Sequence, residues 1–367
     1  MALIDAGGSP TRPAGLINRL AASPAFQSFC ARVPGLRGIA RREGAALFDL
    51  MQGFVQSQML MALVELRVLH FLADGPASAD HLAGRAQVPP ARMQILLQAG
   101  AAMRLLKRRG ARFALARRGA AFLSVPGLED MVRHHDVLYR DLADPVAFIR
   151  GESAPDLARF WPYVFGATGP MDAGATARYS RLMADSQTLV ADEALAHLSL
   201  KGARRLLDVG GGTGAFLRAV RKRYPGLSLA LFDLPDVVAQ AVLPGDVARH
   251  GGSFRDDPLP EGADVISLVR VLYDHADETV AALLAKVHAA LPPDGRVLIV
   301  EPMSGGAEPD PQTDVYFAVY TLAMQTGRTR SPAEITTLLR GAGFEAISRA
   351  SGCRSYLARV ICARKSG

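Results

Sequence analysis

Long apolar runs are missing from this sequence, and cysteine is scarce. No run approaches the roughly 20 residues that a membrane-spanning helix requires. The N-terminus also lacks the apolar core of a signal peptide. The three cysteines, Cys30, Cys353 and Cys362, have no metal-ligand spacing, so free thiols in a reducing compartment are expected. The sequence therefore predicts a cytoplasmic protein without a metal site.

Acidic residues are absent between Asp80 and Glu129, although the whole chain has 35 of them. This interval contributes to a net charge of +7 at pH 7. Its basic residues are Arg85, Arg92, Arg104, Lys107, Arg108, Arg109, Arg112, Arg117 and Arg118. Such a patch can meet nucleic acid or an anionic membrane surface. Arginine-rich surfaces without a partner are also common.

Length and composition favour two folded domains. A chain of 367 residues is too long for one small core, and a hydrophobic content of 49% is typical of a globular protein. We predict a disordered tail over residues 1–15, a mainly helical domain over 16–185 and an α/β domain over 186–367. Apolar residues between 16 and 75 recur at helical spacing. One predicted helix has apolar residues on more than one face, so we expect it to pack against a second copy of the chain in a homodimer.

The segment from Ser78 to Arg117 has the outline of a winged helix. Ser78 can cap a short helix, Val88-Pro89-Pro90 leads into a second helix predicted to end near Arg109, and a hairpin follows. With the basic residues, this makes DNA binding an alternative function. The second helix, PPARMQILLQAGAAMRLL, has few side chains that read bases and many that suit packing. We therefore expect no nucleic-acid partner.

From Arg204 onward, predicted strands alternate with helices. The strands are RRLLDVG, SLALFDL, ADVISLVRVLY and RVLIVEP. This alternation predicts a doubly wound parallel sheet, with SYLARVICAR as an edge strand.

A glycine-rich turn follows the first strand, in LLDVGGGTGAFLRAV. Gly210, Gly212 and Gly214 let the backbone turn sharply and let a ligand approach the helix N–H groups. Asp233 ends the next strand and can accept both hydroxyls of a ribose. The spacing also satisfies a dinucleotide fingerprint, but Asp208 would repel a pyrophosphate. S-adenosylmethionine carries an ammonium and a sulfonium, so the acid favours that cofactor.

The chain resembles the plant- and bacterial-type class I O-methyltransferases over nearly its whole length. The stretches LLDVGGGTG, FDLPDVV, HGGSF and VLYDHADE carry the resemblance, with ALVELRVLHFLADGPASADHLA in the N-terminal half. It implies an α/β fold, in which a Rossmann-like SAM methyltransferase sheet follows a mainly helical, winged-helix-like dimerisation and substrate-lid domain. It also implies S-adenosyl-L-methionine as the cofactor, with Phe254 against the adenine and Ser253 where the family commonly has an acid. The predicted cofactor-binding residues are Asp208, Gly210, Gly212, Gly214, Asp233, Ser253, Phe254, Arg270 and Ser186.

Several segments are most similar to the carotenoid hydroxyl O-methyltransferases of purple phototrophic bacteria. They include SPAFQSFCARVPGLRGIARREGAALFDLMQGFVQSQ, MVRHHDVLYRDLADPVAFIRGE and ARFWPY. The resemblance implies in-line methyl transfer to the tertiary hydroxyl of an acyclic hydroxycarotenoid, and peripheral contact with the membrane that holds this hydrophobic substrate. O-methylation of a soluble phenol or polyketide and C-methylation of a bacteriochlorophyllide are the alternatives.

Tyr273 stands where the wider family has its general-base histidine, while Glu301 keeps one of the two glutamates that flank it. Free tyrosine has a pKa of about 10, so it is a poor base at pH 7 but a good hydrogen-bond partner. His135 is our first candidate for the base, with His134 and His275 behind it. Alignment of the acceptor oxygen with the methyl group is expected to supply most of the acceleration, roughly 7–11 kcal/mol. The predicted substrate contacts are His134, Met183, Tyr320 and Met324.

Overall fold

The computed structural model describes residues 15–160 and 187–366, and the chain forms two compact units that divide after Ala120. Nearly all of the predicted tail over residues 1–15 lies outside the described residues. No helix in the two described ranges combines the length and hydropathy needed to cross a bilayer.

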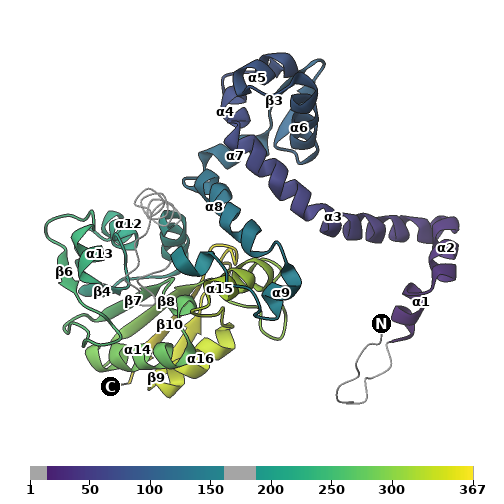
Figure 1. Ribbon diagram of the computed structural model, residues 1–367. Coiled ribbons are helices and arrows are strands. Elements are labelled where there is room, and N and C mark those ends of the chain that lie inside the picture. The colour runs from purple at the N-terminus through teal and green to yellow at the C-terminus, as the bar shows by residue number, and fades with distance from the viewer. Residues whose placement is uncertain (1–14, 161–186, 367) are drawn as a thin grey trace. The chain divides into compact units, whose positions relative to one another are not determined.

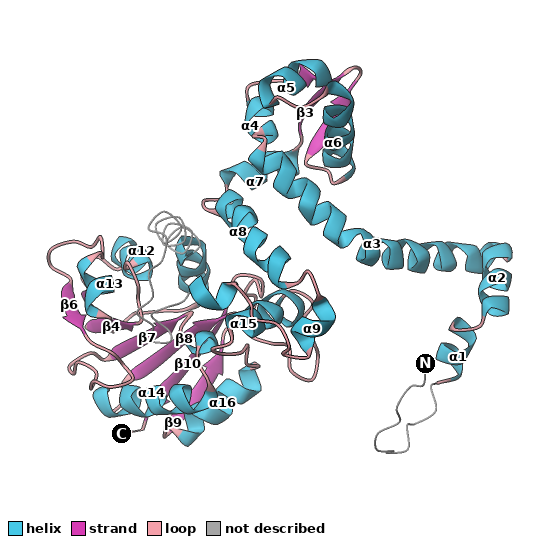
Figure 2. Cartoon of the chain, viewed as in Figure 1, coloured by secondary structure: helices cyan, strands magenta, loops and turns pink. Residues whose placement is uncertain are grey.

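The first unit is mainly helical, as predicted (Figures 1 and 2). Its elements are α1 (Leu16–Ala21), α2 (Pro24–Arg32), α3 (Pro34–Glu65), α4 (Val68–Ala73), β1 (Ala77–Ser78), α5 (Ala79–Ala86), α6 (Pro90–Ala102), β2 (Leu106–Arg109) and β3 (Arg112–Leu115), and α7 (Arg117–Ser124) spans the division. Proline occupies the first turn of α2, α3 and α6, where its missing N–H has no helical partner to lose.

The winged-helix outline is present in the first unit. The hydroxyl of Ser78 accepts a hydrogen bond from the N–H of His81 at 3.3 Å and caps α5. The strands form a small antiparallel sheet in the order β1-β3-β2. The predicted end of the second helix near Arg109 is wrong, because α6 ends at Ala102 and the chain turns back at Gly110, so that residues 106–109 pair with β3. Met93 and Leu97 of α6 are fully buried, which agrees with a packing role.

The second unit contains a seven-stranded sheet in the order β6-β5-β4-β7-β8-β10-β9. Its strands are β4 (Arg205–Val209), β5 (Ser228–Asp233), β6 (Ala248–Gly251), β7 (Val265–Val269), β8 (Arg296–Glu301), β9 (Phe344–Arg349) and β10 (Arg359–Lys365). Its helices and turns include α8 (Leu128–Asp141), α9 (Pro145–Ile149), η1 (Leu157–Phe160), α12 (Ala215–Arg223), α13 (Pro235–Ala239), η2 (Leu272–Asp274), α14 (Asp277–Ala290), η3 (Thr313–Phe317), α15 (Ala318–Met324) and α16 (Pro332–Gly341).

The five strands from β6 to β8 are parallel, as the alternation of strands and helices predicted. The prediction that the last strand lies at the edge is wrong, because β10 pairs antiparallel with β8 on one side and with β9 on the other. Both faces of the sheet are covered (Figure 1). α14 and α16 pack on one face, and α12, α13 and a helix over residues 187–197 pack on the other.

The helices α8 and α9 belong to the second unit, although the sequence placed them in a domain that ended at residue 185. Val137 and Leu138 of α8 and Phe148 of α9 form a buried cluster with Tyr320 and Met324 of α15. This packing holds the histidines of α8 beside the carboxyl end of the sheet.

Candidate active site

A glycine turn joins β4 to α12 and forms one wall of a pocket. Gly210, Gly212 and Gly214 have φ angles of 68°, 57° and 82°, in the left-handed region that side chains disfavour. A Cβ atom at Gly211 would lie 2.4 Å from a carboxylate oxygen of Asp208. The turn therefore packs its backbone directly against the strand beneath it.

Asp208 lies under this turn and is fully buried. Its Oδ1 accepts a hydrogen bond from the hydroxyl of Ser267 at 2.6 Å, and its Oδ2 has no hydrogen-bond partner among the described atoms. Burial raises the pKa of the Asp208 carboxyl group to about 7, although the bond from Ser267 opposes this shift. The acid thus supports the turn from below, and Ser267 is a partner that no sequence signal indicated.

Asp233 ends β5 at the pocket. Its Oδ2 accepts the N–H of Gly212 and its Oδ1 accepts the N–H of Leu234, both at 2.7 Å. Burial raises the pKa of Asp233, and these two backbone hydrogen bonds oppose the shift. A carboxylate has about four acceptor positions, so two remain for hydroxyl groups of a ligand.

The pocket brings together Gly210, Asp233, Ser253, Phe254 and Arg270, all predicted to bind the cofactor. Its full lining is Gly210, Asp233, Leu234, Gly252, Ser253, Phe254, Arg255, Arg270, Val271, Asp274 and His275. Another predicted cofactor residue, Ser186, lies outside the described residues.

His275 is part of this pocket rather than of a separate catalytic group. Its ring meets that of Phe254 edge to face at 5.2 Å, and its Nδ1 lies 3.1 Å from a guanidinium nitrogen of Arg255. Burial, Arg255 and Arg330 lower the pKa of His275 to about 4. The imidazole is therefore neutral at pH 7.

The chemistry of the pocket fits S-adenosylmethionine. Phe254 offers an aromatic face for a purine, and Asp233 offers a carboxylate for ribose hydroxyls. The Nε of Arg270 is buried without a hydrogen-bond partner in the part of the chain that the structure describes. This guanidinium suits the carboxylate of the methionine portion.

Glu301 positions the turn η2, which carries Tyr273. Its Oε1 accepts the backbone N–H groups of Val271 at 2.8 Å and Leu272 at 2.7 Å, and its Oε2 accepts that of Tyr273 at 3.4 Å. Burial raises the pKa of Glu301 to about 7, against the effect of these hydrogen bonds. The sequence predicted a catalytic role for Glu301, whereas both of its carboxylate oxygens accept hydrogen bonds from the backbone of this turn.

Arg330 holds the same turn from the other side. Its guanidinium donates to the carbonyls of Leu272 and His275, each at 2.7 Å, and to Asp277. Only 2% of Arg330 is exposed. Sequence reasoning missed this residue because its backbone partners are more than 50 positions away.

Tyr273 is almost completely buried, with 4% of its surface exposed. Burial raises the pKa of its hydroxyl group, although the neighbouring Arg270 guanidinium opposes the shift. The residue is therefore a neutral phenol at pH 7, in agreement with the expectation that it is a poor base.

His134 and His135 of α8 each reach a tyrosine from the segment 313–324. The Nε2 of His134 lies 2.8 Å from the hydroxyl of Tyr320, and the Nε2 of His135 lies 2.8 Å from the hydroxyl of Tyr316. The two tyrosine rings stack with centroids 6.0 Å apart. Sequence reasoning missed Tyr316, although its four-residue spacing from Tyr320 was a usable signal.

Met324 and Met183, the other two predicted substrate contacts, do not belong to these His–Tyr pairs. Met324 is fully buried in the cluster formed by α8, α9, η1 and α15, next to Tyr320. Met183 lies outside the described residues.

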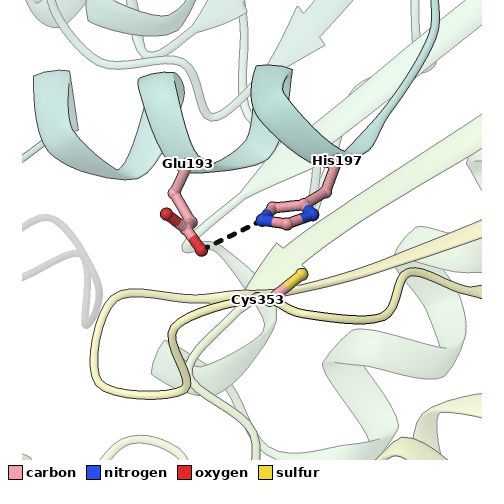
Figure 3. Close-up of side chains that lie close together, drawn as sticks. All are labelled: Glu193, His197 and Cys353. Atoms are coloured by element: carbon pink, nitrogen blue, oxygen red, sulfur yellow. Dashed lines mark ion pairs between the residues drawn. The ribbon is translucent and has the colours of Figure 1, made fainter.

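The structure also brings together Glu193, His197 and Cys353, whose possible metal-ligand atoms all lie within 4.8 Å of one another (Figure 3). The carboxylate of Glu193 accepts hydrogen bonds from the backbone N–H and the guanidinium of Arg354, each at 2.6 Å. Because the Arg354 guanidinium already neutralises the Glu193 carboxylate, we interpret the cluster as an ion pair that links the helix 187–197 to the loop before β10.

Comparison with known proteins identifies the family. The O-methyltransferase domain matches residues 139–345, and the O-methyltransferase dimerisation domain matches residues 48–125. The chain is 60% identical over 354 residues to the demethylspheroidene O-methyltransferase of Cereibacter sphaeroides. This alignment covers 94% of this chain and 93% of that protein. It is 56% identical over 365 residues to the enzyme of that name from Rhodobacter capsulatus, covering 98% and 92% of the two chains.

Solved structures of methyltransferases share this fold. The crystal structure of CalO1, a methyltransferase in calicheamicin biosynthesis with SAH bound, superposes with a TM-score of 0.75 at 25% identity and covers 89% of this chain and 98% of its own. The crystal structure of human N-acetylserotonin methyltransferase in complex with SAM superposes with a TM-score of 0.75 at 24% identity. The match covers 89% of this chain and 98% of that chain. The chain therefore belongs to the O-methyltransferase family with an N-terminal dimerisation domain, and the predicted fold class is confirmed.

Proposed function

We propose that this protein transfers a methyl group from S-adenosylmethionine to the hydroxyl of demethylspheroidene, an acyclic hydroxycarotenoid. The observation that carries the proposal is the near full-length similarity to two demethylspheroidene O-methyltransferases, at 60% and 56% identity. The pocket supports it, because Asp233, Phe254 and Arg270 suit the three parts of the methyl donor.

The polar groups beside η2 also favour an alcohol as the acceptor. The hydroxyls of the buried Tyr273 and Tyr320 and the half-buried imidazole of His134 are neutral at pH 7. Neutral groups can exchange hydrogen bonds with an un-ionised alcohol without placing a second charge beside the sulfonium. A tertiary alcohol is less acidic than a phenol, so it fits this environment.

The test is an incubation with a labelled methyl donor and three classes of acceptor: demethylspheroidene, small phenols and bacteriochlorophyllide. We expect a methyl ether of the carotenoid, identified by its mass. Rapid methylation of a phenol without detergent or membranes, and none of the carotenoid, would overturn the proposal.

A second copy of the chain is the partner that we propose for the middle of α3. The family dimerisation domain begins at residue 48. Only Leu63 and Val64 of α3 are buried within the described chain. The large apolar side chains exposed along its centre are Leu47, Phe48, Leu50, Met51, Phe54 and Val55. Burial of these side chains in a homodimer removes a surface that a soluble monomer rarely exposes.

We further propose that residues 15–42, the arginine-rich arm, contact an anionic membrane surface. The arm includes α1, α2 and the start of α3, and it contains no acidic residue. Its arginines are Arg19, Arg32, Arg37, Arg41 and Arg42. Leu20, Phe29 and Ile39 are 41%, 56% and 51% exposed. Basic and apolar side chains on one helical segment match the headgroup region of a bilayer, where the hydrophobic substrate resides.

A further inference from the structure

The two His–Tyr pairs described above differ in their surroundings. Tyr320 lies on α15, which contacts η2, and it interacts electrostatically with Tyr273, Arg270 and Asp274. Tyr316 lies on the π-helical turn η3, and its hydroxyl is 3.7 Å from the sulfur of Met131. Both tyrosines interact with the Arg270 guanidinium, but Tyr320 interacts with Tyr273 and Asp274 of η2 as well. Its pair with His134 is therefore the one that we assign to the turn carrying Tyr273.

Arg270 connects this pair to the cofactor pocket. It lines that pocket. Its guanidinium also donates to the hydroxyl of Tyr273 at 3.3 Å and lies 5.7 Å from the ring centroid of Phe317. Polar groups that interact through hydrogen bonds or electrostatically thus extend from the cofactor pocket to α8.

Both members of the pair formed by Tyr320 and His134 are uncharged at pH 7. Burial and the neighbouring His135 lower the pKa of His134 to about 4, so its ring is neutral at pH 7. Burial raises the pKa of Tyr320 well above its usual value, so its hydroxyl is protonated. In the His134 tautomer that carries its proton on Nδ1, the Tyr320 hydroxyl donates to the Nε2 atom, 2.8 Å away. The lone pairs of the Tyr320 oxygen stay available for another donor.

We propose that the Tyr320 hydroxyl accepts the proton of the acceptor alcohol while its own proton passes to the Nε2 atom of His134. Tyr320 is then the catalytic residue, and His134 is a positioning residue and the final proton acceptor. This inference rests on the proposed function.

The bound cofactor supplies its methyl group while its sulfur keeps the electron pair of the broken S–C bond, so the acceptor oxygen must release one proton as its O–C bond forms. Tyr320 and His134 remove that proton in one concerted shift, and the positive charge ends on the imidazole. A relay of this kind suits a tertiary alcohol, because such an alcohol is too weakly acidic to ionise beforehand. Its proton leaves only as the new bond forms.

The kinetic test compares Tyr320→Phe and His134→Gln with the wild-type protein. We expect each variant to lower kcat by at least about 100-fold, the lower end of the usual contribution of proton transfer. KM for the acceptor and the affinity for S-adenosylmethionine should stay within about threefold. The kcat of the double variant should lie within about threefold of the kcat of the slower single variant, because the two side chains act as a unit. Tyr356→Phe, at a tyrosine 49% exposed on a loop, is the control for loss of a phenolic hydroxyl.

The variants Tyr316→Phe and His135→Gln decide between the two pairs. We expect their losses in kcat to be at least tenfold smaller than those of the Tyr320 and His134 variants. Equal or larger losses would transfer the role to the other pair and overturn the proposal. Retention of kcat within threefold by both Tyr320→Phe and His134→Gln would overturn it as well.

A spectroscopic measurement on the cofactor-free protein separates the relay from a folding defect. With ¹⁵N-labelled histidine, Tyr320→Phe should shift the Nε2 resonance of His134 and leave that of His135 in place, and Tyr316→Phe should do the reverse. Unchanged His134 resonances in Tyr320→Phe would show that the hydrogen bond is absent in solution, which overturns the proposal. If the wild-type protein methylates a phenol instead of the carotenoid, the proposed function fails, and the same variants assayed on that phenol still decide the relay.

Discussion

The Nη2 atom of Arg270 lies 3.3 Å from the hydroxyl oxygen of Tyr273, and its guanidinium carbon lies 5.4 Å from the centroid of the same ring. Because the cation donates to the phenol oxygen, the hydroxyl proton of Tyr273 points elsewhere and can be donated. Arg270 is held in place by its own backbone N–H, which donates to the carbonyl of Val300 at 2.8 Å. This arrangement makes Tyr273 a hydrogen-bond partner within the site rather than a base.

Replacement of Tyr273 by phenylalanine should therefore lower kcat only about two- to tenfold. One neutral hydrogen bond contributes about 0.5–1.5 kcal/mol, whereas loss of a general base costs about 10²–10⁴ in rate. Steady-state kinetics of Tyr273→Phe with saturating methyl donor measure this difference. A 1,000-fold loss with normal cofactor affinity would instead identify Tyr273 as the base.

Gly211→Ala should remove cofactor binding and destabilise the protein. The added methyl would lie 2.4 Å from Asp208 Oδ2 and 2.7 Å from Leu231 Cδ1. Overpacking of this kind typically costs about 1–3 kcal/mol. Gly226→Ala is the control, because a Cβ there meets no atom within 4 Å. Calorimetry with S-adenosylmethionine and urea unfolding measure both effects, and equal behaviour of the two variants would contradict the packing described for the turn.

Asp208→Asn should change how stability depends on pH. Burial raises the pKa of Asp208 from its usual 3.8 to about 7, so the native state holds this proton more tightly than the unfolded chain does. The stabilisation from the protonated acid is fully present below pH 3.8 and is lost as the pH rises through about 7. The free energy of unfolding of Asp208→Asn should therefore increase relative to that of the wild-type protein as the pH rises through this window. The increase should be up to about 1.4 kcal/mol per pH unit.

Urea unfolding of both proteins between pH 4 and 7 measures the Asp208→Asn difference. A constant difference in the free energy of unfolding across this range would show that Asp208 ionises with an ordinary pKa.

Arg354→Ala should destabilise the protein by removing the ion pair between Arg354 and Glu193, without affecting catalysis directly. Burial alone would raise the pKa of Glu193, but the hydrogen bonds from Arg354 lower it below its usual value. Removing one partner of a buried pair typically costs about 3–5 kcal/mol, and the loss here should be nearer 2 because 51% of the Arg354 side chain is exposed. Thermal unfolding measures this loss. Addition of Zn²⁺ or a chelator should leave the melting temperature of the wild-type protein unchanged, and a rise with Zn²⁺ would identify a metal site instead.

Neutralising the arginine-rich arm should weaken membrane binding. The variant with Arg37, Arg41 and Arg42 replaced by glutamine removes three charges, each worth about 1 kcal/mol near an anionic surface. Sedimentation with vesicles containing phosphatidylglycerol should show wild-type binding that falls as salt rises and a much weaker binding of the variant. Turnover of substrate presented in detergent should be the same for both proteins. Equal binding of both proteins to neutral and anionic vesicles would contradict a role for the arm.

The sequence by itself determined the parts of the protein that depend on local order. The glycine turn and the acid at 233 follow buried strands, so their spacing alone predicted that they meet. Gly210 and Asp233 line one pocket, and Gly212 donates its N–H to Asp233. The winged-helix outline was equally readable, since Ser78 caps one helix and Pro89-Pro90 begins the next. Within this outline the end of α6 was misplaced, because pairing with β3 outweighed the helical pattern of residues 103–109.

Only the tertiary structure decided which side chains from distant segments meet. Nothing in the sequence pairs His134 with Tyr320, 186 positions away, or brings Arg330 against the carbonyls of η2. The position of β10 inside the sheet likewise follows from its pairing with β9, which the sequence pattern did not reveal. Such contacts depend on how α8, α15 and the sheet pack together. Local spacing carries no information about that packing, and the pKa values of the buried groups follow from it.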